Sequence, residues 1–330
     1  MRRVLIVLSI LAALAAAAVG GGWAWLNNSY KRPGPLQMPA TLIIPKGTSP
    51  DAIADNLLSA GIIDDTKVFH LARRLLAAKK PLRAGEFAFP AAISVAGTIA
   101  HLQSGKTVVR KVTIAEGLSN AEISRTLIRT AGLTGAPGPL PKEGGLLPET
   151  YHFSFGDARA AIIKRMDGAM TRLLAEAWPK RATGLPLASP GEALILASIV
   201  EKETGVSSER ARVAGVFINR LRKGMRLQSD PTVIFGLTQG NGPLGRSITK
   251  TDLKSQTAYN TYVIKGLPPT AIANPGRASI LAVLNPAPTK DLYFVADGTG
   301  GHAFAETLKG HQRNVAKWRK IERARKQKAN

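Results

Sequence analysis

The sequence contains no cysteine among its 330 residues. Disulfides, a thiolate nucleophile, a cysteine metal site and a lipid-modified amino-terminal cysteine are therefore all excluded. The five histidines are scattered, and none has a second histidine at i, i+4 beside a glutamate, so we expect no zinc site. No Gly-x-Ser-x-Gly motif is present, which argues against the nucleophile elbow of α/β-hydrolases.

Charged residues are absent from Val4 to Leu26. This run is long enough to span a bilayer, two arginines precede it, and two tryptophans near its end suit a membrane interface. We therefore predict an uncleaved single-pass transmembrane anchor over residues 1–26, with the bulk of the chain outside the cytoplasm. A cleaved signal peptide is the alternative, because the alanine-rich part of the run offers small residues for cleavage.

Acidic residues are few, since 22 Asp and Glu face 45 Lys and Arg and the formal net charge is +23. Much of the excess lies in residues 309–330, which we predict to form a basic carboxy-terminal helix or tail. Basic chains often bind nucleic acid, but an exported domain does not meet the chromosome. We therefore expect no nucleic-acid partner, and anionic lipid headgroups or wall polymers, or no partner at all, instead.

A sequence motif occurs twice after a polar, proline-containing linker predicted over residues 27–40. Residues 42–57 align without gaps on residues 112–127. Each copy predicts a short β-branched strand, a glycine turn and a helix capped by a serine. The identical pairs are Ile44/Ile114, Gly47/Gly117, Ser49/Ser119, Ile53/Ile123 and Leu57/Leu127.

The first copy continues into a second helix over residues 64–76 and an alternating strand over residues 85–89. The resulting strand–helix–helix–strand order over residues 41–108 resembles LysM-type modules, which bind N-acetylglucosamine-containing glycans. A small α/β spacer without sugar affinity explains the same pattern equally well, because the elements consist of ordinary capping chemistry. Residues 109–187 contain the second repeat and a loop that leads into the next predicted domain, which begins at residue 188.

Further elements are predicted from local patterns along the chain. Residues 158–178 read as an amphipathic helix that Asp157 is placed to cap. Residues 208–223 predict another helix, with several arginines, Arg220 among them, on its outer side. Residues 225–233 are polar and read as extended before Pro231. Together these elements indicate an α+β fold.

The stretch 189–204 predicts the helix around which the chain is organised. Ser189 can cap it, Pro190 suits its first position, and an apolar run follows. Glu201 and Glu203 lie in its last turn, where the helix dipole disfavours negative charge. Burial there would raise the pKa of a carboxyl group and allow it to act as a general acid. Periodicity does not say which glutamate is buried, and two exposed, salt-bridged acids are the alternative.

Long motifs surround this helix, at residues 143–144, 148–151, 196–204, 216–221, 225–233, 257–262, 266–269 and 292–298. With these motifs the chain resembles the endolytic murein transglycosylases, the YceG-like membrane-anchored proteins of bacteria. The similarity runs from the anchor almost to the tail. Glu149 departs from the pattern, because the family usually has aspartate there.

The resemblance implies a helix-rich, lysozyme-like catalytic core over residues 188–308 with Glu201 as the catalytic acid. The implied reaction cleaves the MurNAc–GlcNAc β-1,4 bond within glycan strands without water and leaves a 1,6-anhydro-MurNAc end. Glu201 would protonate the leaving oxygen and then take the proton of the sugar's own C6 hydroxyl. One carboxylate then suffices where ordinary glycosidases need a pair, and no metal or cofactor is implied.

The resemblance also implies a sugar-binding groove, an inner-membrane location with the catalytic part in the periplasm, and work beside peptidoglycan synthases (penicillin-binding proteins). A non-catalytic wall-binding protein and a cytosolic lyase acting on a small metabolite are the competing hypotheses, and the apolar run argues against the second. Turn-forming and packing roles are the alternative for each groove residue. The expected groove residues are Gln228, Asp230, Tyr259, Asn260, Tyr262, Glu149 and Glu203.

Overall fold

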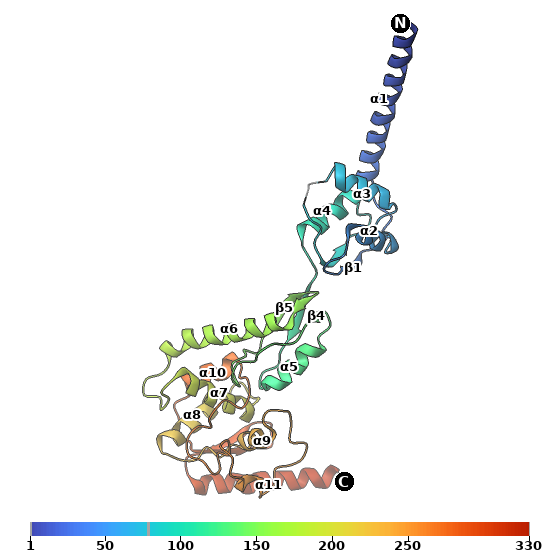
Figure 1. The fold of residues 1–330 in the computed structure, drawn as a ribbon. Coiled ribbons are helices and arrows are strands. Elements are labelled where there is room, and N and C mark those ends of the chain that lie inside the picture. Colours follow the sequence, from blue (N-terminus) through green and yellow to red (C-terminus); the bar gives the residue numbers. More distant parts are fainter. Residues whose placement is uncertain (1, 78–79, 330) are drawn as a thin grey trace. The chain divides into compact units, whose positions relative to one another are not determined.

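The computed structural model describes residues 2–77 and 80–329 of the chain, which mix helices with short strands (Figure 1). The chain divides into two compact units. The first runs up to Arg110 and includes His152–Asp157, and the second comprises Lys111–Tyr151 and the chain from Ala158 onward.

The first unit contains the predicted strand–helix–helix–strand order. Strands β1 and β2 pair antiparallel, with Leu42 opposite Phe87. The side chains of Phe69, Phe87 and Phe89 are fully buried and form part of the core. Apolar residues on the strands and helices therefore close one hydrophobic core. The elements are β1 (Ala40–Ile44), α2 (Pro50–Ser59), α3 (Thr66–Leu75), β2 (Gly85–Phe89) and α4 (Val95–Ser104).

Helix α1 (Arg2–Lys31) opens this unit (Figure 1). It is the one helix within residues 2–77 and 80–329 that is long and apolar enough to cross a membrane. Its last turns contact α3 and α4, and Leu26 is buried in the core of the unit. The helix therefore continues through residues 27–31 of the predicted linker. No proline interrupts it before Pro33, and the apolar core stabilises its end.

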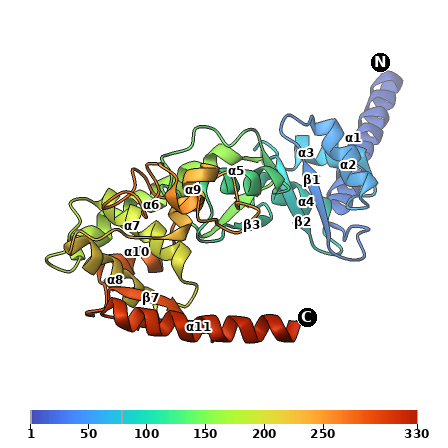
Figure 2. The same cartoon turned by 90° about the horizontal axis from the view of Figure 1, so that it is seen from below.

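The second unit is built mainly of helices. Strand β3 pairs with β5, β4 pairs with β6, and β7 pairs antiparallel with β8. Helix α11 packs along β7 and β8 (Figure 2). Strands β3, β5 and β6 each have residues in both units. The elements from β3 onward are β3 (Val109–Thr113), α5 (Asn120–Arg129), β4 (Leu133–Thr134), β5 (Thr150–Ser154), β6 (Asp157–Ala158), α6 (Arg159–Ala177), α7 (Pro190–Glu203), α8 (Arg210–Arg222), α9 (Asp230–Thr238), α10 (Arg277–Leu284), β7 (Tyr293–Ala296), β8 (His302–Ala305) and α11 (Leu308–Ala329), with short 3-10 turns at Trp178–Lys180 and Asp252–Lys254.

Helix α7 lies at the centre of the second unit and contacts α8, α9 and α10. The predicted cap is confirmed, because the Ser189 hydroxyl accepts a hydrogen bond from the Glu192 N–H at 3.2 Å. Ala193, Leu196 and Val200 are fully buried in the core. The polar end of this helix is thus held in place by packing along most of its length.

Helix α9 departs from the prediction, because the sequence read as extended up to Pro231. The helix begins at Asp230 and has Pro231 in its first turn. A proline there costs no hydrogen bond, since the first N–H groups of a helix have no partner within it. Pro231 therefore marks the start of a helix.

Candidate active site

The last turn of α7 places its two glutamates in different surroundings. Side chains two residues apart on a helix point about 200° away from each other. Glu203 points toward Ser229 and the start of α9, whereas Glu201 points toward Gly276 and Arg210. The two carboxyl groups therefore contact different residues.

Glu203 is a buried carboxyl group with the character of a general acid. Its Oε1 accepts a hydrogen bond from the Ser229 hydroxyl at 2.5 Å. Burial raises the pKa of Glu203 to about 7, the negative charge of Asp230 adds to the rise, and the Ser229 hydrogen bond opposes it. The carboxy-terminal end of α7 disfavours negative charge in the same direction. A carboxyl group with such a pKa is partly protonated at neutral pH and can donate a proton.

Glu203 lines a cavity of about 510 Å³, which we call the Glu203 cavity. Two carboxylates, an amide, a guanidinium and aromatic rings share its wall, which is a mixture that suits a sugar with hydroxyl groups and apolar ring faces. The lining residues are Glu203, Arg220, Leu227, Gln228, Asp230, Tyr262, Tyr293, Phe294, Val295, Leu308 and His311.

The segment 228–230 forms one wall of this cavity and is fixed by buried Thr261. The Gln228 N–H donates to the Thr261 carbonyl at 3.1 Å, and the Ser229 N–H donates to the Thr261 hydroxyl at 2.9 Å. Gln228 adopts a left-handed backbone with a φ of 52°, which is uncommon for a residue with a side chain. The Tyr262 hydroxyl donates to Asp230 at 2.6 Å. Three of the predicted groove residues thus meet Glu203 in one cavity.

Glu201 lies outside the lining of that cavity. Its Oε2 accepts the Gly276 N–H at 2.9 Å, and Arg210 Nη2 lies 3.8 Å from Oε1. Burial, with the Glu201 charge second, raises the pKa of neighbouring Glu116, and Arg210 opposes this rise. Glu201, the expected catalytic acid, therefore contacts Arg210 and the start of α10.

Three predicted groove residues, Asn260, Tyr259 and Glu149, make contacts away from the Glu203 cavity. Asn260 is fully buried, and its amide donates to the carbonyl of Ser255 at 2.8 Å and to that of Leu253 at 3.2 Å. The Tyr259 hydroxyl bonds to Thr270 at 2.9 Å. None of these side chains lines the Glu203 cavity, and Glu149 is exposed, with its carboxylate 3.7 Å from Arg277.

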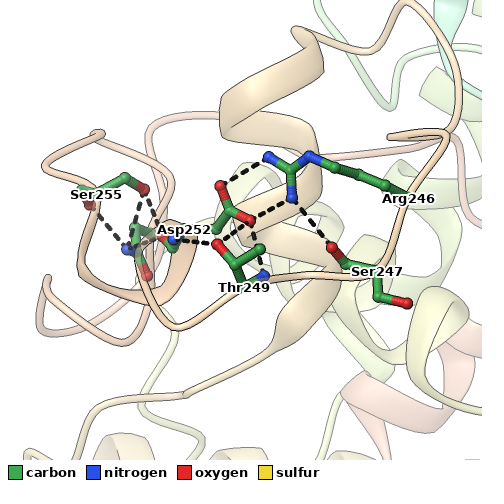
Figure 3. Close-up of polar contacts among 6 residues, drawn as sticks. Arg246, Ser247, Thr249, Asp252 and Ser255 are labelled. Atoms are coloured by element: carbon green, nitrogen blue, oxygen red, sulfur yellow. Dashed lines mark hydrogen bonds and ion pairs between the residues drawn. The ribbon is translucent and has the colours of Figure 1, made fainter.

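The loop that Asn260 holds is also tied by an ion pair (Figure 3). Asp252 accepts hydrogen bonds from both terminal nitrogens of Arg246, at 2.6 and 3.0 Å, and from the Thr249 N–H at 2.8 Å. The Arg246 hydrogen bonds, followed by those of Thr249, hold the pKa of Asp252 well below its usual range. Asn260 is therefore a structural residue of this loop.

The sequence did not point to the other seven residues of the lining, of which Arg220, Tyr293, Phe294 and His311 have charged, aromatic or imidazole side chains. Arg220 was predicted on the outer side of its helix, but it is only 7 % exposed. Its Nε donates to the Leu292 carbonyl at 2.7 Å and its Nη1 to the Leu227 carbonyl at 2.6 Å. Leu292 is 72 residues further along the chain and Leu227 lies beyond the end of α8, so helical periodicity alone carries no sign of either partner.

Metal-ligating side chains do not cluster in the part of the chain that the structure describes. No group of three or more His, Cys, Asp or Glu residues within 2–77 and 80–329 could hold a metal ion.

Comparison with known proteins gives a consistent result. The model of the YceG-like family matches residues 42–317. A protein of Bacillus subtilis (strain 168) named endolytic murein transglycosylase is 36 % identical over 183 residues, 54 % of this chain and 48 % of that protein. A Streptococcus pneumoniae (serotype 2, strain D39) protein of the same name is 26 % identical over 94 % of this chain and 64 % of its own length. The chain thus spans about half of the first relative's length and less than two thirds of the second's.

A solved structure shares the fold. The crystal structure of a yceG-like protein from Listeria monocytogenes aligns with a TM-score of 0.51 and 30 % identity, covering 84 % of this chain and 99 % of that one. The family model covers most of the chain. The chain therefore belongs to the YceG-like family.

Proposed function

We propose that this chain is an endolytic murein transglycosylase that uses Glu203 as its general acid. The observation that carries the proposal is the Glu203 cavity, in which a carboxyl group with a pKa raised by burial to about 7 faces polar and aromatic side chains. The relatives named endolytic murein transglycosylases support the substrate class. Assigning the acid to Glu203 departs from the expectation of Glu201, because Glu201 lies outside the cavity and is clamped by Gly276 and Arg210.

The proposed reaction proceeds in two proton transfers at one carboxyl group. The protonated Glu203 gives its proton to the glycosidic oxygen between MurNAc and GlcNAc, and the C1–oxygen bond breaks. The resulting Glu203 carboxylate then takes the proton of the C6 hydroxyl of the same MurNAc, and that oxygen closes on C1. The products are a strand with a 1,6-anhydro-MurNAc end and a strand with a free GlcNAc 4-hydroxyl. No water is consumed.

The other residues of the Glu203 cavity have different roles in the proposed reaction. Arg220 places a fixed positive charge near Glu203, which stabilises the carboxylate formed after the first proton transfer. Asp230 is held by the Tyr262 hydroxyl at 2.6 Å, so both groups present fixed oxygen atoms to sugar hydroxyls. The rings of Tyr293 and Phe294 supply an apolar wall.

Mass spectrometry of the cleavage products tests the reaction. Purified peptidoglycan is incubated with the full chain in detergent, and the fragment ends are identified. Anhydro-MurNAc ends are expected. Reducing ends would contradict the proposal and would indicate a hydrolase in which Asp230 activates water from the same cavity. Intact strands that still bind the chain would indicate a non-catalytic wall-binding protein.

We also propose that α1 anchors the chain in the bacterial inner membrane as a single pass, with the second unit in the periplasm. The length and apolar character of this helix support the proposal. Nascent glycan strands near the membrane would then be the substrate, and cleavage there would end their elongation beside the peptidoglycan synthases.

A further inference from the structure

Helix α11 carries a row of basic side chains that the proposed reaction does not use. Successive members are four, four, three and three residues apart, so they lie within about 120° of the helix circumference. All of them are exposed, and the row is about 21 Å long. We call it the basic stripe, and its members are Lys309, Arg313, Lys317, Lys320 and Arg323.

The other side of α11 is packed and fixes the direction of the stripe. The His311 ring stacks on Tyr293 with 5.1 Å between ring centroids, and the Asn314 side-chain amide donates to the Phe304 carbonyl at 3.3 Å. These contacts hold the helix against β7 and β8, so the stripe faces away from the strands. In the described part of the chain, no ion pair joins a member of the stripe to a carboxylate. Its charges are therefore available to a ligand.

A cavity of about 440 Å³ lies beside the stripe, between the end of β8 and the first turns of α11, and we call it the α11 cavity. Arg313 and Lys317 line it, and Glu306 is the one acidic residue of its lining, so its net charge is positive. A carboxylate that enters this cavity meets a guanidinium and an ammonium group, which form charge-assisted hydrogen bonds with such anions.

The first turn of α11 also belongs to the Glu203 cavity. Leu308 and His311 line that cavity, and Lys309 of the stripe lies between them in the sequence. The stripe therefore begins one residue from the wall of the Glu203 cavity. A substituent of a polymer bound in that cavity has basic side chains within its reach.

The charge of the proposed substrate indicates what the stripe binds. The sugars of a murein strand are uncharged, and its negative charges are the carboxylates of the peptides attached to MurNAc. A lipid surface is the other anionic partner to weigh, but helices that bind at a bilayer surface bury a large apolar face there. The large apolar side chains Val315, Trp318 and Ile321 of α11 lie outside the stripe and are partly buried. The stripe therefore suits an anionic peptide better than a membrane.

We propose that the basic stripe and the α11 cavity bind the carboxylates of the peptide side chains on a glycan whose sugars occupy the Glu203 cavity. The inference rests on the proposed function for the identity of this substrate. Exposed basic side chains attract an anionic ligand during encounter and in the complex. The stripe thus adds affinity for peptide-bearing strands and takes no part in the proton transfers.

Binding of the full chain in detergent to purified peptidoglycan sacculi, free of other wall polymers, tests the inference in the cold. Native sacculi are compared with sacculi whose carboxyl groups have been converted to amides by carbodiimide and ammonia. The double variant Arg313→Gln/Lys317→Gln should bind native sacculi roughly fivefold more weakly than the natural chain, because exposed ion pairs each contribute a small factor. The two chains should bind amidated sacculi alike.

Lys164→Gln/Arg172→Gln is the matched control. It removes two exposed charges from α6 of the same unit, so the net charge falls equally. Its affinity for native sacculi should equal that of the natural chain. Molar salt should abolish the difference between the natural chain and the α11 double variant, since exposed charges are then screened.

Two results would overturn the inference. One is an α11 double variant that binds native sacculi as tightly as the natural chain, and the other is a difference that persists on amidated sacculi. Phosphatidylglycerol added to the detergent micelles should not weaken binding to native sacculi. Competition that depends on Arg313 and Lys317 would overturn the inference and assign the stripe to a lipid surface. Binding as expected without any cut strands would overturn only the proposed reaction.

Discussion

Two glutamates on one helical turn differ because their neighbours differ. Glu203 faces a cavity and one hydroxyl donor, whereas Glu201 faces a backbone N–H and an arginine. Burial without a cation in direct contact favours the neutral acid, and a partnered site favours the anion. This difference, more than position on the helix, supports the proposal that Glu203 donates the proton.

The raised pKa of Glu203 predicts a stability effect. Its ordinary value is 4.5 and its folded value about 7, so the folded chain loses stability as the pH rises from about 4.5 to 7. Glu203→Gln stays neutral and should therefore be more stable than the natural chain at pH 8, by on the order of 3 kcal/mol. At pH 4.5 the two should unfold alike. Denaturant unfolding in detergent at both pH values measures this.

Glu201→Gln is the matched control for that measurement. It weakens the contacts with Gly276 and Arg210, so it should give no gain in stability at pH 8. A gain equal to that of Glu203→Gln would contradict the assignment of the neutral carboxyl group to Glu203.

The same pKa predicts the pH dependence of cleavage. The first step needs protonated Glu203, so the rate should be high below pH 7 and fall as the pH rises above about 7. The rate of glycan cleavage under saturating substrate, measured from pH 5 to 9, checks this. A rate that keeps rising to pH 9 would show that the essential group acts in its ionised form.

Among the helices and strands, the sequence predicted those features that depend on residues close together in the chain, such as helix caps. The serine caps of both repeats are present, since Ser49 accepts the Ala52 N–H and Ser119 forms a full capping box with Glu122. Asp157 was predicted to cap α6, but it accepts the Ser154 N–H instead, and α6 begins without a side-chain cap. A turn partner three residues earlier competes with a cap, and sequence alone does not decide between them.

The candidate site was harder to predict, because its contacts join distant parts of the chain. Gln228, Asp230 and Tyr262 meet Glu203 as expected of groove residues. Asn260, two residues from Tyr262, instead turns inward to loop carbonyls. Whether a side chain in this loop points into the cavity or into the loop depends on how the loop folds back on itself. No local sequence pattern shows this. Sugar binding by residues 41–108 stays a prediction.

Asn260→Ala tests the structural role of this side chain. It removes the donors that hold the carbonyls of Leu253 and Ser255 in a buried place. We expect a loss of about 1–3 kcal/mol in the free energy of unfolding, measured by denaturant titration. Gln256→Ala is the control, since its amide makes one exposed bond to Lys254 at 3.3 Å. Unchanged stability with weakened glycan binding would instead place Asn260 in the groove.

For the whole molecule, the proposed membrane location depends on α1. Its apolar part is exposed in the structure and lacks charge from Val4 to Leu26. We predict that the full chain stays in the membrane pellet after alkaline carbonate washing of bacterial membranes. A chain lacking residues 2–26 should be released. Release of the full chain by the same wash would contradict a transmembrane anchor.

In the proposed reaction, Glu203 carries out both proton transfers. The most direct test measures anhydro-MurNAc ends by mass spectrometry for the natural chain, Glu203→Gln and Glu201→Gln side by side. Removal of a general acid costs roughly 10²- to 10⁴-fold in rate, so Glu203→Gln should lose that much while Glu201→Gln loses far less. Full loss in Glu201→Gln with activity retained in Glu203→Gln would contradict the account and place the acid at Glu201.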